Sequence, residues 1–181
     1  MNAIGLIELS SIAAGMQSAD MMLKTSSIQL ILARTICSGK YMALIGGDVA
    51  SVQAAINVAT DKLEESIIDT FVIPNVHPDI FPALNGTNVP PTLEALGILE
   101  AFSVASLIEG ADEACKVADV RLIEIRLAMA LGGKAFCTLT GDVSAVTSAI
   151  EAGARKISEK GLLVNKVVIP NARPELLNEI V

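Results

Sequence analysis

The chain of 181 residues has no tryptophan, one histidine and only 3% aromatic residues. An aromatic-lined ligand pocket is therefore not expected, because such pockets are built largely from these side chains. Basic residues are outnumbered 13 to 20 by acidic ones, giving a formal net charge of -7. A protein that binds phosphate backbones needs a basic face, so we expect no nucleic-acid partner.

Cysteine and long apolar runs are also scarce. Three cysteines, an odd number, make a disulfide framework unexpected. No uninterrupted apolar stretch reaches the roughly 18 to 20 residues of a membrane span, so no membrane partner is expected. The chain opens with a strand-like run at 3–7 and no basic flank, so we predict no secretory signal and cytoplasmic residence.

What the chain has in excess is aliphatic side chains. Hydrophobic residues make up 52% of the sequence, and most of them are Ala, Ile, Leu and Val. This content is high for a soluble protein of the same length, and it indicates tightly packed elements with apolar surface to spare. We expect that surplus to form interfaces between subunits.

The sequence repeats itself. Residues 3–8, Ala-Ile-Gly-Leu-Ile-Glu, return 92 positions later as Ala-Leu-Gly-Ile-Leu-Glu at 95–100. Further matches follow in the same order, with small insertions in the second copy: Ala19-Asp20 and Ala111-Asp112, Lys24 and Lys116, Arg34 and Arg126, 46–49 and 140–143, 73–75 and 169–171. Two domains are therefore predicted, 1–86 and 94–181, joined by a Gly- and Pro-containing linker at 87–93.

Each copy alternates between two periodicities. Apolar runs at 3–8, 28–36, 41–45 and 67–73 predict strands, and a 3.6-residue spacing after Ser10 or Ser11 and after Asp48 predicts two helices. The apolar positions of the first helix are Ile12, Ala13, Met16, Ala19, Met22 and Leu23. The order β-α-β-β-α-β is a ferredoxin-like pattern, so the fold class is α/β of the α+β type, with a mostly antiparallel sheet in each domain.

One thiol lies in a turn between two predicted strands, in the run Thr-Ile-Cys-Ser-Gly-Lys at 35–40. A metal cluster needs three or four ligands, and no second Cys or His lies within ligand spacing of Cys37. Its partners would have to come from other chains. Cys115 and Cys137 fall on apolar positions and are predicted to be small core residues.

Residues with catalytic potential are few. His77 stands alone, without a triad or a metal set, so a structural or edge role is predicted for it. Asp48 and Asp142 each follow a Gly-containing break and open a helix, which explains them as caps rather than acids. No pair of nucleophile and base emerges, and we predict that the protein is not an enzyme.

The repeated motifs resemble the bacterial microcompartment shell domain. They are Ala-x-Gly-x-Ile/Leu-Glu at the start, Ala-Asp followed by Lys, Gly-Lys opening the third strand, Gly-Asp-Val before the second helix, and Ile-Pro-Asn at the end. The turn at 36–40 is similar to that of the tandem, iron-sulfur-binding shell proteins of propanediol-utilisation compartments. The resemblance covers essentially the whole chain, twice.

This resemblance implies a homotrimer in which two fused domains per chain form a flat pseudohexameric ring. It also implies pore loops around the central axis: Ile36, Cys37, Ser38 and Gly39 in the first copy and Leu131, Gly132 and Gly133 in the second. Three Cys37 thiolates would hold one [4Fe-4S] cluster there, for passing electrons across the shell or holding a labile cluster. The second copy, Ala-Met-Ala-Leu-Gly-Gly-Lys at 128–134, offers no thiol.

At the ring edge, the resemblance implies contacts through Lys24 and Lys116, with Asn75 and Asn171 where the family has an arginine. Replacing arginine by asparagine removes a charged, forked donor and predicts a weaker edge contact. The expected partners are other shell proteins edge to edge, and enclosed enzymes or a redox partner.

Two other functions stay open at this point. The ring centre could be a plain metabolite pore without a cofactor, lined by Cys37. A ferredoxin-like small-molecule sensor that assembles on binding its ligand would have the same pattern of elements.

Overall fold

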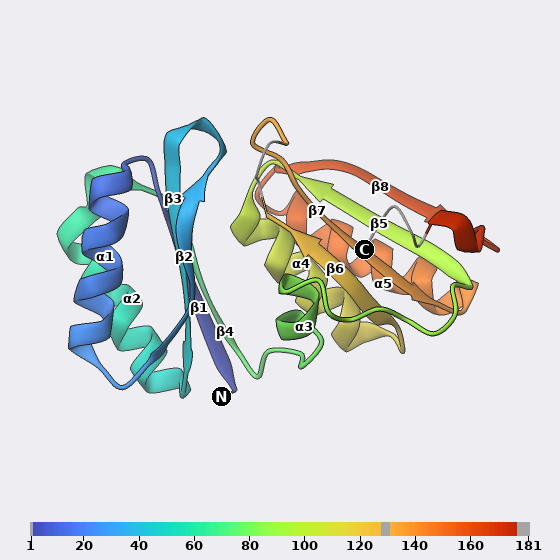
Figure 1. Cartoon of the computed structure of the whole chain (residues 1–181), viewed down its shortest axis with the longest axis horizontal. Helices are drawn as coiled ribbons and strands as arrows, with labels where there is room; N and C mark the ends of the chain where they lie inside the picture. Colours follow the sequence, from blue (N-terminus) through green and yellow to red (C-terminus); the bar gives the residue numbers. More distant parts are fainter. Residues whose placement is uncertain (1, 128–130, 177–181) are drawn as a thin grey trace. The chain divides into compact units, whose positions relative to one another are not determined.

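A computed structural model of the chain describes residues 2–127 and 131–176, and the chain divides into two compact units, 1–76 and 77–181 (Figure 1). The first unit consists of β1 (Ala3–Leu9), α1 (Ile12–Thr25), β2 (Gln29–Ile36), a 3₁₀ turn (Cys37–Gly39), β3 (Lys40–Gly47), α2 (Val49–Leu63), a second 3₁₀ turn (Glu64–Ser66) and β4 (Ile67–Pro74). The order β-α-β-β-α-β is the one that the sequence predicts.

The second unit repeats this order after one short helix. It consists of α3 (Ile80–Leu84), β5 (Ala95–Ala101), α4 (Val104–Val117), β6 (Arg121–Arg126), β7 (Ala135–Gly141), α5 (Val143–Ser158), β8 (Leu163–Ile169) and a 3₁₀ turn (Pro174–Leu176). Helix α3 lies between the two repeats, in a segment for which no helix is predicted from the sequence.

Both sheets are antiparallel and have the same topology. The strand orders are β2-β3-β1-β4 and β6-β7-β5-β8. The registers match as well, since Ala3 pairs with Gly47 and Ala95 with Gly141. Even the irregularities coincide, because the edge strand shifts register between Leu30 and Leu32 in one sheet and between Leu122 and Glu124 in the other. The fold class predicted from the sequence is confirmed, and the duplication extends to backbone detail.

The core of each unit lies between its sheet and its two long helices, which cover one face of the sheet (Figure 1). In the first unit, alternate residues of β1 such as Ile7 and Leu9 meet Met22 of α1 and Ile56 of α2 in one buried cluster. Strand alternation and the 3.6-residue helix period bring these apolar positions together. Of the described helices, none is long and apolar enough to cross a bilayer.

Candidate functional site

The predicted pore turn is the tip of the β2–β3 hairpin. Cys37 is half-buried at the start of the 3₁₀ turn, and the next two residues have left-handed backbones, with φ of 68° at Ser38 and 72° at Gly39. Ile36, immediately before the turn, is buried. Glycine adopts this conformation without strain, which explains its position in the turn. The thiol therefore lies at a defined point of a tight loop.

The second copy makes the corresponding turn at the end of the 128–134 stretch. Residues 128–130 lie outside the described residues, but Gly132 and Gly133 have φ of 62° and 86°. Two successive positive φ angles align Gly132 with Ser38 and Gly133 with Gly39. Leu131 thus occupies the position equivalent to Cys37, in agreement with the repeated Gly-Lys pairs at 39–40 and 133–134.

A lysine after each turn binds a glutamate of the central strand. Lys40 Nζ lies 2.8 Å from Glu8 Oε1, and Lys134 pairs with Glu100 in the same way. The two pairs differ in burial: the Glu8 side chain is 2% exposed, whereas that of Glu100 is 27% exposed. A buried carboxylate that loses its partner is left as an uncompensated charge, so we expect loss of the lysine to destabilise the first hairpin more than the second.

The other two cysteines are enclosed in the second unit. Burial raises the pKa of Cys137 to about 12, and burial also raises the pKa of Cys115. Both thiols therefore stay protonated at neutral pH, and their prediction as core residues is confirmed by exposures of 0% and 6%. Among the described residues, no group of three His, Cys, Asp or Glu side chains of one chain could hold a metal ion. With ligands from the described residues, metal binding at Cys37 would need several chains.

The predicted edge lysines each pair with an aspartate one helical turn earlier. Lys24 Nζ lies 2.6 Å from Asp20, and both side chains are exposed. Lys116 pairs with Asp112, which is buried. Asn75 and Asn171 have left-handed backbones, with φ of 53° and 49°, a conformation that asparagine tolerates better than most residues. This gives a local reason for asparagine at these positions; the edge role of the four residues stays a prediction.

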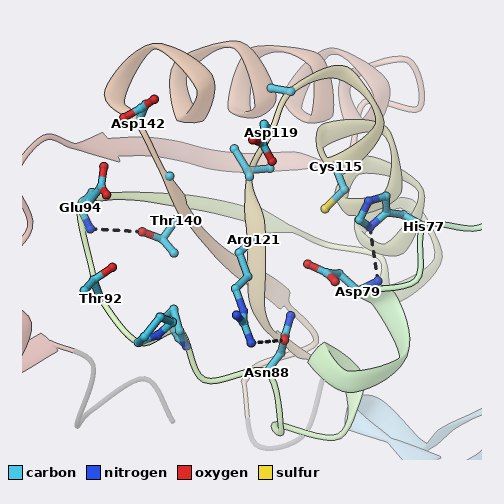
Figure 2. Close-up of a pocket in the computed structure, with 15 residues that line it drawn as sticks. His77, Asp79, Asn88, Thr92, Glu94, Cys115, Asp119, Arg121, Thr140 and Asp142 are labelled. Atoms are coloured by element: carbon cyan, nitrogen blue, oxygen red, sulfur yellow. Dashed lines mark hydrogen bonds between the residues drawn. The ribbon is translucent and has the colours of Figure 1, made fainter.

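A cavity of about 810 Å³ lies in the second unit, between the connecting segment 77–94 and the edge formed by α4, β6 and β7 (Figure 2). Its polar side chains hold that segment in place. Arg121 Nη2 donates to Asn88 Oδ1 at 3.0 Å, the Glu94 amide donates to Thr140 Oγ1 at 3.4 Å, and the Leu122 amide donates to Asp79 Oδ2 at 3.4 Å. We interpret these groups as structural because their hydrogen bonds join one element to another.

His77 takes part in the same network. Its amide donates to Asp112 Oδ1 at 2.7 Å, and its Nδ1 accepts from the Asp79 amide at 3.3 Å. These bonds agree with the structural role predicted for it. Sequence reasoning missed the Asp112 contact because the partner lies 35 residues away on another element.

Together, these features define a class: a tandem-domain α+β protein with one half-buried turn thiol in its first copy. Comparison with known proteins gives the family. The BMC domain matches residues 3–76 and again 95–172. The chain is 40% identical to the bacterial microcompartment shell protein PduT of Citrobacter freundii, over 99% of this chain and 97% of that protein. The chain therefore belongs to the BMC-domain family.

Two other matches fit this assignment. A crystal structure of a microcompartment protein from Desulfitobacterium hafniense DCB is 47% identical and has a TM-score of 0.90. The match covers 98% of this chain and 99% of that chain. The shell protein EutM of Salmonella typhimurium LT2 is 36% identical over 84 residues, which are 46% of this chain and 85% of that protein. The protein is accordingly a structural component of the bacterial microcompartment shell, located in the cytoplasm.

Proposed function

We propose that three copies of the chain close into a pseudohexameric ring of the shell facet, with one [4Fe-4S] cluster held at its centre by Cys37 of each chain. The observation that carries this proposal is the position of Cys37, a thiol at the tip of a tight hairpin in one copy only. Whole-chain identity to a tandem shell protein favours this reading over a ferredoxin-like sensor.

The residues present fit such a cluster in three respects. Thiolates are the usual ligands of iron-sulfur clusters, and three-fold symmetry turns one thiol per chain into three. The neighbouring Ser38 and Gly39 are small, so the turns of three chains can approach one axis. Leu131 at the equivalent place in the second copy cannot ligate, which leaves the fourth iron to water or a small donor.

When bound, the cluster would supply one-electron transfer at the shell. The protein's part is to hold and enclose it: Cys37 ligates, and the Lys40–Glu8 pair fixes the hairpin base next to the turn. We assign no catalytic step to the chain. The proposed partners are other shell proteins at the ring edges, through Lys24 and Lys116, and a redox partner or enclosed enzymes.

Anaerobic purification followed by iron and sulfide analysis tests the proposal. We expect a brown trimer with about four iron atoms per three chains. Cys37→Ser is expected to lose the colour and the iron while remaining trimeric. Leu131→Cys in the Cys37→Ser background is the matched control, since it returns one thiol per chain at the equivalent place in the second copy. We expect it to restore iron binding.

A trimer that stays colourless and iron-free after anaerobic reconstitution would contradict the cluster. The ring would then have a plain metabolite pore. In that case Cys37→Ser should leave growth on the compartment's substrate and pore conductance unaltered, whereas loss of the cluster should change the redox behaviour of the isolated shell.

A further inference from the structure

Helix α1 has an apolar stripe that the first unit leaves open. Residues spaced four, four and three apart share one face of a helix. On α1 these are Ile12, Met16, Asp20 and Leu23, and the three apolar members are 37%, 58% and 44% exposed. The residues 92 positions later on α4 are 1%, 0%, 4% and 6% exposed: Val104, Ile108, Asp112 and Cys115. The same stripe is thus bare in one copy and covered in the other.

The segment that follows the first repeat, 77–84, lies at the stripe of α4. Its helix α3 packs against α4 and against the edge strand β6 (Figure 1). The His77 amide donates to Asp112 in the middle of the stripe, and Asp79 accepts from the Leu122 amide of β6. Ile80 and Ala83 are 0% and 1% exposed. Figure 2 shows His77, Asp79 and Cys115 on the same side of the cavity.

A stretch related to this segment follows the second repeat, with the same proline and conservative changes from Asp to Glu and from Ile to Leu. His-Pro-Asp-Ile-Phe-Pro-Ala-Leu at 77–84 corresponds to Arg-Pro-Glu-Leu-Leu-Asn-Glu-Ile at 173–180. The chain also leaves both repeats in the same way, since the Val76 amide donates to Asn2 O and the Ala172 amide to Glu94 O. Yet Leu176, the counterpart of the fully buried Ile80, is 38% exposed.

We propose that residues 173–176 of one chain dock on the α1 stripe and the β2 edge of a second copy. They would bind there as 77–80 binds α4 and β6 within one chain, through His77 and Asp79. Arg173 takes the place of His77 opposite Asp20, Glu175 that of Asp79 opposite the Leu30 amide, and Leu176 that of Ile80. An arginine facing an aspartate adds a complementary charge, which favours this occupant over an unrelated protein.

The proposal adds a specific contact between neighbouring chains to the ring of the proposed function. It rests on that function only for the number of copies in the ring. A tail that binds the next copy makes a head-to-tail contact, and such contacts close into a ring when the rotation per copy allows it. Leu30 belongs to the edge strand of its sheet and is 40% exposed, so the contact also covers an open sheet edge.

Sedimentation equilibrium of the full chain and its variants tests the docking. Ile12 and Val49 form a matched pair, because each is the first residue of a helix and they are 37% and 40% exposed. Only Ile12 lies on the stripe. We expect Ile12→Glu to weaken association on the order of 100-fold and Val49→Glu to leave it unchanged. Deleting 173–181 should act like Ile12→Glu, with circular dichroism confirming that each variant is folded.

Exchanging the two charges gives a second test, because a double variant that recovers association must be folded. Asp20→Arg and Arg173→Asp are each expected to weaken association, and the double variant to recover most of it. If the full chain is trimeric and the tail deletion is equally trimeric, the docking is overturned while the ring stands. If the full chain is monomeric at all concentrations, both are overturned.

Discussion

The two copies share one backbone but fill it with different side chains. Gly15 of α1 lies so close to β3 that an added Cβ would come within 2.4 Å of Tyr41. In the second copy the equivalent positions hold Leu107 and Ala135, both fully buried. A small helix residue facing a large strand residue has become a large one facing a small one. Packing volume is conserved at this contact although neither residue is, and so core residues can diverge between copies while the fold stays constant.

The turn and its lysine–glutamate pair also differ between the copies, without such compensation. Cys37 is replaced by Leu131, and the buried Lys40–Glu8 pair by the more exposed Lys134–Glu100 pair. Since the turns keep their left-handed backbone in both copies, the difference is chemical rather than conformational. The thiol is therefore confined to one copy of a turn whose backbone both copies keep.

The largest expected effect comes from placing a large side chain at position 15, opposite the large Tyr41. Gly15→Leu should lower the free energy of unfolding of the first unit by at least about 3 kcal/mol, because the new side chain overlaps the base of the Tyr41 ring. Calorimetry checks the stability, and fluorescence of Tyr41, the one tyrosine of the chain, reports on the first unit.

The second copy supplies the control for this prediction. The double variant Gly15→Leu with Tyr41→Ala copies the arrangement of Leu107 and Ala135, and it should recover most of the lost stability. A double variant as unstable as Gly15→Leu would show that the two contacts are not equivalent.

Removing the lysine of each lysine–glutamate pair should have an effect of intermediate size on stability, and the effect should differ between the two pairs. Lys40→Met leaves the Glu8 carboxylate buried without its partner and is expected to cost about 3 kcal/mol. Lys134→Met removes an exposed partner and should cost less than about 1 kcal/mol. Urea unfolding followed by circular dichroism measures both. Equal losses would mean that burial of the carboxylate does not set the difference.

Much of the fold was predictable because hydrophobic period and repetition agree. The strand–helix order, the Ser11 cap, which accepts from the Ala14 amide, and the core positions of Cys115 and Cys137 are all confirmed. Helix α3 was missed because it has only five residues and contains Pro82, so it shows neither length nor period. Its stability comes from contacts with α4 and β6, which no local pattern reports.

The sequence also did not show which apolar residues of the helices would be buried. The apolar positions predicted for the first helix included Ile12, Met16 and Leu23, and the structure leaves these three exposed. A sequence pattern shows that a residue is apolar but not what will cover it. At the candidate site, the turn was predictable from Ser38 and Gly39. What the sequence did not show is that both turns have the same pair of left-handed residues, at Ser38 and Gly39 and at Gly132 and Gly133.

The prediction that Asp48 and Asp142 both cap helices is half correct, and this difference gives the smallest expected effect. Asp48 accepts from the Ser51 amide at 2.9 Å, which lowers the pKa of its carboxyl group. Asp142 also holds the N-cap position, that of α5, but its side chain makes no capping hydrogen bond, so the prediction is confirmed there for the position only. Asp48→Ala should therefore lower the melting temperature by a few degrees, and Asp142→Ala by less.

The pH dependence distinguishes a cap from a mere helix-starting residue. Because the pKa of Asp48 is lowered in the folded state, its contribution is present above the unfolded pKa of about 3.9 and is lost as pH falls through the folded value. The difference in melting temperature between the parent protein and Asp48→Ala should thus be constant near neutral pH and shrink below about pH 4. The Asp142→Ala curve should run parallel to the parent curve. If both variants lost their effect together at low pH, the two aspartates would contribute through charge at the helix start, and the hydrogen bond to Ser51 would not explain the difference.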